Sequence, residues 1–122
     1  MDKPPLTVAY CHCEDCRRWT GAPVAAFAAF DRADVISQLP NAFSGAPGVE
    51  RWTCPTCHAP LAAAFDYLPD QIYVPIGIVD QADTLLPEMH SHAGSALPWL
   101  HIDDDLPRAN ASARKALNTA SK

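Results

Sequence analysis

The sequence predicts a mainly β fold of short strands joined by turns, and three observations support this prediction. The 122 residues include 12 prolines, which interrupt helices and favour short strands joined by turns. Short runs of β-forming residues recur along the chain. All five cysteines lie in two clusters, at residues 11–16 and 54–57, and each cluster adjoins one of these runs. A chain of this length is expected to form one domain.

The expected domain spans residues 1–108, and its first half carries strands that flank the first cysteine cluster. Residues 6–10 are β-formers that run directly into this cluster. Residues 14–19 are expected to form one or two helical turns, which a Thr-Gly-Ala-Pro sequence ends. The apolar run 24–30 is expected to be a buried strand. Residues 109–122 are polar and Ala-rich, so we expect a flexible or weakly helical tail there.

The second half is expected to contain a hairpin and two further strands. Residues 49–53 and 61–65 should pair with each other, with the second cysteine cluster at the tip of their hairpin. Residues 72–79 give the strongest strand signal, and Pro75 within them suggests an edge position or a bulge. Residues 89–93 are expected to form a short strand.

Charge and composition exclude several classes of protein. The formal net charge of −5 argues against a nucleic-acid binder, which would be expected to show a basic face. The sequence contains no apolar run of the ~18 residues needed to span a bilayer, and its first residues do not resemble a signal segment. We therefore expect a cytoplasmic protein, in which clustered cysteines indicate metal or redox sites rather than disulfides.

The first cluster has the spacing Cys-x-Cys-x-x-Cys, formed by Cys11, Cys13 and Cys16. This spacing lets three sulfurs converge on one ion at about 2.3 Å from each, which is typical of zinc. Zn²⁺ with three thiolates carries a net charge of −1, and Arg17 and Arg18 could offset it if they turn back. The sequence therefore predicts a zinc site in this loop.

The fourth ligand of this site decides what the zinc could do. Structural zinc sites are closed by four protein ligands, whereas catalytic sites keep one exchangeable position. In an open site, the ion could bind a substrate thiol and hold it as the reactive thiolate. In the alternative, His12 or a distant histidine closes the site and leaves a structural zinc.

The second cluster, Cys54-Pro55-Thr56-Cys57, resembles the knuckle that usually supplies half of a four-thiolate zinc site. Two more ligands would be needed, and His58 is too close in sequence to complete a relaxed tetrahedron. Either this site is incomplete or the two clusters share an ion. A redox Cys-x-x-Cys is the functional alternative, although such pairs are typical of the start of a helix rather than of a hairpin.

Two histidines, His90 and His92, alternate on the strand expected at 89–93, so both should face the same side. Each could contact a substrate or act as an acid or base near neutral pH. The alternative is that they are surface residues or packed residues with satisfied hydrogen bonds.

Taken together, these motifs resemble the glutathione-dependent formaldehyde-activating enzyme family, which includes centromere-protein-V-like members. The similarity runs from about residue 6 to residue 108. The segments that carry it, in order, are Tyr10–Arg18, Thr20–Pro23, Cys54–Cys57 with Ala59-Pro60-Leu61, Leu97–Asp103 and Leu106–Arg108. No single one of these segments is specific for the family, but the whole set in this order is.

The resemblance implies a β-tent-like fold with two zinc sites and a carbon–sulfur lyase activity. The substrates implied are glutathione, or a similar small thiol, and formaldehyde, or another small aldehyde, and the product is S-(hydroxymethyl)glutathione. By the same resemblance, Cys11, Cys13 and Cys16 form the catalytic site, and Cys54 and Cys57 form half of the structural site. Glutathione has two carboxylates, for which the candidate cationic contacts are Arg17, Arg18, Arg51 and Lys3.

One family feature is expected but does not occur in this sequence. Family members begin with a strand that carries a Gly-x-Cys-x-Cys-Gly motif, which supplies the other half of the structural site. The sequence is therefore expected either to be an N-terminally shortened member or to begin too late in the reading frame. A shortened member would expose a sheet edge, which could pair with a second copy in a homodimer. The alternative function is a non-catalytic, zinc-stabilised binding module with a closed metal site.

Overall fold

The computed structural model describes residues 4–40 and 43–109 and confirms a mainly β fold. The chain forms two compact units. The first unit comprises Met1–Thr7 and Phe27–Leu85, and the second comprises Val8–Ala26 and Leu86–Lys122. Lys3 and residues 110–122 of the expected tail lie outside the described residues, so the predictions made for them stay predictions.

The first unit is an antiparallel sheet in the strand order β3-β4-β5-β6-β2. Its strands are β2 (Ala25–Asp31, of which the unit takes Phe27 onward), β3 (Phe43–Ala46), β4 (Val49–Thr53), β5 (Pro60–Phe65) and β6 (Gln71–Pro75). The expected hairpin is confirmed, because β4 pairs with β5 from Val49 opposite Phe65 to Thr53 opposite Pro60. The second cysteine cluster therefore lies at the hairpin tip.

The core of the first unit combines large and very small side chains. Trp52, Ile72 and Tyr73 are among the largest fully buried side chains. Ala28, Ala29 and the run Ala62–Ala64 are also buried. Alternation of large and small residues on facing positions lets a sheet pack to native density without voids. The sheet that supports the hairpin is therefore held mainly by apolar burial.

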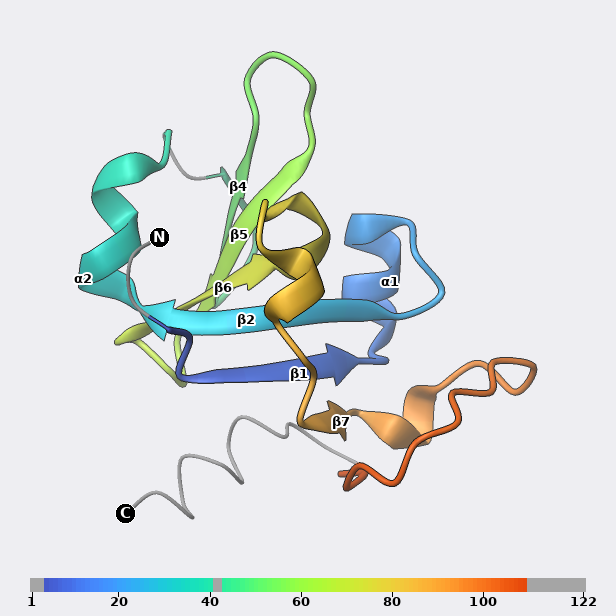
Figure 1. Ribbon diagram of the computed structural model, residues 1–122. Coiled ribbons are helices and arrows are strands. Elements are labelled where there is room, and N and C mark those ends of the chain that lie inside the picture. Colours follow the sequence, from blue (N-terminus) through green and yellow to red (C-terminus); the bar gives the residue numbers. More distant parts are fainter. Residues whose placement is uncertain (1–3, 41–42, 110–122) are drawn as a thin grey trace. The chain divides into compact units, whose positions relative to one another are not determined.

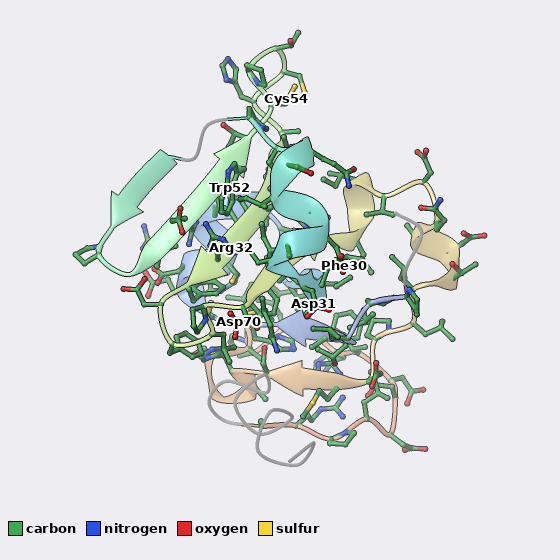
Figure 2. All side chains as sticks on the ribbon, turned by 90° about the vertical axis from the view of Figure 1, so that its left-hand side faces the viewer. Phe30, Asp31, Arg32, Trp52, Cys54 and Asp70 are labelled. Atoms are coloured by element: carbon green, nitrogen blue, oxygen red, sulfur yellow. The ribbon has the colours of Figure 1, made fainter. Side chains whose placement is uncertain are left out.

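A short helix, α2 (Arg32–Val35), crosses the sheet of this unit in front of the strands shown in Figure 2. The backbone N–H of Arg32 donates to the carbonyl of Asp70. The Arg32 guanidinium donates to Glu50 at 3.0 Å and lies 5.6 Å from the ring centroid of Trp52. These contacts fix the start of the helix against β4. A 3₁₀ turn, Ile36–Gln38, continues it.

The strand expected at 72–79 is shorter than the apolar run that predicts it. β6 ends at Pro75, and residues Ile76–Ile78 form a 3₁₀ turn. Proline lacks the N–H that would extend the hydrogen-bonded ladder. The expected edge position is wrong, since β6 lies between β5 and β2, with Pro75 opposite Phe27 at the end of the pairing. Another 3₁₀ turn follows at Ala82–Thr84.

The second unit is built on two parallel strands and one helix (Figure 1). β1 (Thr7–Cys11, from Val8 in this unit) pairs with β7 (Met89–Ser91), so that Cys11 lies opposite Ser91. Helix α1 (Glu14–Thr20) follows the first cysteine cluster and ends at Gly21, whose φ of 73° is the left-handed conformation that favours glycine.

The far side of β7 pairs with residues 107–109. His90 forms a parallel bridge with Arg108. The N–H of His90 donates to the carbonyl of Pro107, and the N–H of Ala109 donates to the carbonyl of His90. Residues 107–109 therefore hold β7 from one side while β1 holds it from the other.

The prediction that His90 and His92 share one face of a strand is wrong. β7 ends at Ser91, and His92 has a positive φ of 53° before the 3₁₀ turn Ala93–Ser95. This left-handed residue breaks the alternation of side chains. Across the described residues, the structure has no helix of the length and hydropathy needed to cross a membrane.

Candidate metal centre

The three cysteines of residues 11–16, here called the cysteine loop, take their positions from the end of a strand and the start of a helix. Cys11 is the last residue of β1. Cys13 is the N-cap of α1, and its sulfur accepts a hydrogen bond from the backbone N–H of Cys16 at 3.3 Å. Cys16 lies in the first turn of the helix. The change from strand to helix within these six residues, with Cys13 as the cap, brings the three thiols together.

The three sulfurs are close enough to share one ion. The Cys11 sulfur lies 3.4 Å from that of Cys13 and 3.2 Å from that of Cys16, and all three lie within 4.8 Å of one another. Two sulfurs bound at about 2.3 Å to a tetrahedral zinc would stand about 3.8 Å apart. Cys11 and Cys16 are buried and Cys13 is partly exposed. The loop could therefore hold a metal ion, and thiolate ligands suit zinc.

Crowding of the thiols opposes their ionisation when no cation is present. The pKa of Cys16 is raised, first by its hydrogen bond with Cys11, then by that with Cys13, and then by burial. The pKa of Cys13 is also raised, and its hydrogen bond with Cys11 is the largest cause. A bound cation reverses this balance, because metal coordination deprotonates a thiol.

No fourth protein ligand completes the cluster among residues 4–40 and 43–109. Within these ranges, no other His, Cys, Asp or Glu donor atom lies within 4.8 Å of all three sulfurs. His12, the candidate nearest in sequence, is buried, and its Nε2 is hydrogen-bonded to His90 Nδ1 at 2.8 Å. Burial is the main cause that lowers the pKa of His12, and the neighbouring His90 lowers it further.

Beside the cysteine loop, helix α1 contributes to a pocket of about 370 Å³ whose lining includes Glu14, Arg17, Arg18 and Leu97. The two arginines differ in what they contact. Arg18 is exposed and donates to Glu14 at 2.6 Å and 2.8 Å. Arg17 directly follows Cys16, and its Nε is buried and has no hydrogen-bond partner in the described part of the chain. Of these two arginines, Arg17 therefore has the unsatisfied donor.

The second cluster, residues 54–57, is here called the cysteine knuckle. The N–H of Cys54 donates to the carbonyl of Ala59 at 2.9 Å, and the N–H of His58 donates to the carbonyl of Cys54 at 2.8 Å. These bonds close a tight turn in which His58 has a φ of 63°. Hydrogen bonds from the backbone of Cys57 and Thr56 lower the pKa of the Cys54 thiol.

The knuckle is far more accessible than the loop. Cys54 is partly exposed and Cys57 is exposed, and Figure 2 shows Cys54 at the tip of the hairpin. No described His, Cys, Asp or Glu makes a group of three donors with this pair. The pair lies on a hairpin, whereas a redox Cys-x-x-Cys pair typically lies at the start of a helix. Its assignment as half of a zinc site stays a prediction.

One feature of this unit has only a weak signal in the sequence. His90 Nε2 lies 2.9 Å from Asp104 Oδ2, and with the bond from His90 to His12 this forms a chain of three side chains, of which the two histidines are buried. Asp104 stands in an acidic run that, by sequence, is most simply a solvated turn. Two features of the sequence point to this chain of side chains: His12 lies between two cysteines, and His90 lies on a predicted strand.

The part of the chain that contains both cysteine clusters matches a known protein family. The family model described as glutathione-dependent formaldehyde-activating enzyme matches residues 1–95. This range contains the cysteine loop, helix α1, the knuckle and β7. No curated protein matches the sequence.

Proposed function

Because the chain belongs to the glutathione-dependent formaldehyde-activating enzyme family, we propose that it is a zinc-dependent enzyme of the carbon–sulfur lyase type. The reaction joins glutathione and formaldehyde reversibly to give S-(hydroxymethyl)glutathione. Glutathione is abundant in the reducing cytoplasm, where thiols stay free, and the cytoplasm is the proposed compartment.

The observation that carries this proposal is the convergence of three thiols without a fourth described ligand. The donor set fits zinc, and Cys11, Cys13 and Cys16 would hold it. When bound, zinc with an exchangeable position stabilises the thiolate form of a substrate thiol near neutral pH. His12 does not belong to the group of converging donor atoms, and its Nε2 is hydrogen-bonded to His90, so closure of the site by this residue is unfavourable. The closed binding module is therefore the weaker proposal.

The reaction needs no further reagent. The glutathione sulfur forms a bond to the carbonyl carbon, the π electrons of the carbonyl move to its oxygen, and this oxygen takes the proton that the thiol loses. No oxidant or reductant is consumed, so atoms and electrons balance. The main task of the protein is to hold the sulfur beside the aldehyde carbon, and positioning of this kind contributes several kcal/mol to a bimolecular reaction.

Glutathione recognition requires a cation for its carboxylates, and Arg17 meets this need best. Its Nε is buried and without a hydrogen-bond partner in the described chain, so a carboxylate there would satisfy a buried donor. Arg18 already pairs with Glu14. The pocket that both arginines line also includes Leu97 and the turn after α1, so the carboxylate and the peptide backbone of glutathione would find polar and apolar contacts together.

The test is the rate of exchange between free formaldehyde and S-(hydroxymethyl)glutathione, followed by NMR with labelled formaldehyde. The zinc-loaded protein should accelerate exchange above the uncatalysed rate, and Cys13→Ser should remove the acceleration. A control without glutathione separates thiol-dependent catalysis from simple trapping of formaldehyde. If the loaded protein leaves the exchange rate unchanged, the proposed activity is wrong and the binding module becomes the better account.

A further inference from the structure

In the second unit, three side chains form a line of hydrogen bonds, here called the file, that links the C-terminal segment to the cysteine loop. Asp104 Oδ2 lies 2.9 Å from His90 Nε2, and His90 Nδ1 lies 2.8 Å from His12 Nε2. Both rings are buried, with 1% of His90 and 4% of His12 exposed. His12 stands between two cysteines of the loop. The file therefore ends within the candidate metal site.

With both imidazoles neutral, the carboxylate of Asp104 sets the direction of every hydrogen bond in the file. A carboxylate only accepts hydrogen bonds, so His90 must donate from Nε2 to Asp104. A neutral imidazole has one N–H, so Nδ1 of His90 is then an acceptor. His12 must therefore donate from Nε2, and its Nδ1 has no proton. This nitrogen is buried without a partner in the described residues, where a bare acceptor is tolerated better than an unsatisfied N–H.

The acceptor end of the file is itself held in place. Asp104 Oδ1 accepts from the backbone N–H of Leu106 at 2.9 Å and lies 3.1 Å from the Arg108 guanidinium. Arg108 also donates to the carbonyls of Leu106 and Ile102. The carboxylate therefore has a fixed position in its turn, although the surrounding segment forms no long helix or strand.

The rings of His90 and His12 are also held in place by their neighbours. The ring of Tyr10 stacks on that of His90 with centroids 4.7 Å apart, and the ring of His12, joined to His90 by the 2.8 Å hydrogen bond, lies nearly parallel to it with centroids 5.1 Å apart. The backbone of His12 donates to the carbonyl of Ser91 at 3.1 Å. His12 is thus fixed at both its main chain and its ring.

We propose that Asp104 and His90 are positioning residues for the cysteine loop, which they act on through the ring of His12. By holding His12 in one tautomer and one orientation, they fix the backbone between Cys11 and Cys13 and keep the sulfurs converged. Replacement of a residue that is hydrogen-bonded directly to a metal ligand typically changes metal affinity by about 10–100-fold, and we expect an effect within this range here because His12 lies between two of the proposed ligands. The metal part of this inference rests on the proposed function, whereas the tautomer part does not.

The test compares Asp104→Ala with Asp103→Ala in the zinc-loaded protein. The two variants lose the same charge one residue apart, and Asp103 is exposed. The ¹⁵N shifts of the His12 ring report which nitrogen has the proton, and transfer of zinc to a chromogenic chelator reports the release rate. Asp104→Asn is the second variant, because it keeps the shape of the side chain and a neutral acceptor if the alanine variant fails to fold.

The expected result is a wild-type His12 protonated on Nε2 only. Asp104→Ala should give a mixture of tautomers and release zinc about 10–100-fold faster, Asp104→Asn should be intermediate, and Asp103→Ala should match the wild type. The inference is overturned if wild-type His12 has its proton on Nδ1, or if Asp104→Ala releases zinc as slowly as Asp103→Ala. If the wild type binds no zinc at the loop, the proposed function fails and the positioning role with it, and the tautomer data still judge the hydrogen-bond chain.

Discussion

The cysteine loop and the cysteine knuckle use the same ligand type in opposite environments. The loop brings three sulfurs together, two of them buried, between a strand and a helix. The knuckle presents two accessible cysteines at the tip of a hairpin. In the loop, neighbouring thiols raise the pKa of Cys16, whereas in the knuckle backbone N–H groups lower the pKa of Cys54. Burial and the number of ligands, rather than the presence of cysteine, therefore separate a candidate reaction site from a candidate scaffold site.

Removal of one sulfur from each cluster should have the largest and most contrasting effects. Cys13→Ser is expected to abolish metal binding at the loop and the glutathione-dependent exchange, because a three-ligand site that loses one ligand binds metal poorly. Cys57→Ser is expected to lower thermal stability while the loop keeps its metal. Metal analysis and thermal melting of both variants check this. Equal loss of activity in the two variants would remove the distinction between the clusters.

Alkylation kinetics should separate the two clusters in the metal-free protein. Cys54 is expected to react with iodoacetamide first, because it is accessible and its lowered pKa gives more thiolate at a given pH. Cys16 should react last, since it is buried and its pKa is raised. The thiolate fractions differ about tenfold for each unit between two pKa values. Peptide mapping by mass spectrometry gives the order, and modification of Cys16 before Cys54 would contradict it.

The arginines of α1 provide a third contrast, because they follow the loop and have no counterpart after the knuckle. Arg17→Ala is expected to raise the KM for glutathione about tenfold or more, as the loss of a charge-assisted hydrogen bond costs about 1.5–3 kcal/mol. Arg18→Ala is the matched control, and it should change KM less than about threefold, since an exposed ion pair is worth little. Steady-state exchange rates measure both. A larger effect from Arg18→Ala would show that Arg18, and not Arg17, contacts the carboxylate.

The smallest expected effect concerns the backbone of the knuckle. His58 has a φ of 63°, which disfavours any residue with a Cβ. His58→Gly should relieve this strain at the expense of greater freedom in the unfolded chain, with a net stabilisation of about 0.5 kcal/mol. His58→Ala keeps the Cβ and serves as the control. Chemical denaturation measures the difference, and a glycine variant no more stable than the alanine variant would show that the turn is unstrained.

Local patterns predicted much of the fold. The strands at β1, β2, β4 and β5 and the helix after the loop follow from short apolar runs and from capping and turn residues. The same reasoning failed at Pro75, where the apolar run continues but the hydrogen-bonded strand stops. It failed again at His92, whose left-handed conformation is set by the turn that follows β7 and has no marker such as glycine.

The candidate site was predictable only in part. Spacing alone placed Cys11, Cys13 and Cys16 together, because their separation is local. The partner of His12 was not predictable, because His90 and Asp104 reach it through the pairing of β1 with β7 and of β7 with residues 107–109. Parallel pairing joins segments far apart in the sequence, and no local pattern encodes it. The choice between Arg17 and Arg18 likewise depended on the contact of Arg18 with Glu14.

The central claim is that the cysteine loop holds zinc with a position that a substrate thiol can occupy. The most direct measurement is native mass spectrometry of the zinc-loaded protein with glutathione and, separately, with S-methylglutathione, which has no thiol. The account predicts a zinc-dependent, non-covalent adduct with glutathione alone, and its loss in Cys13→Ser. Zinc at the loop with no glutathione adduct, or equal adducts with both ligands, would contradict it.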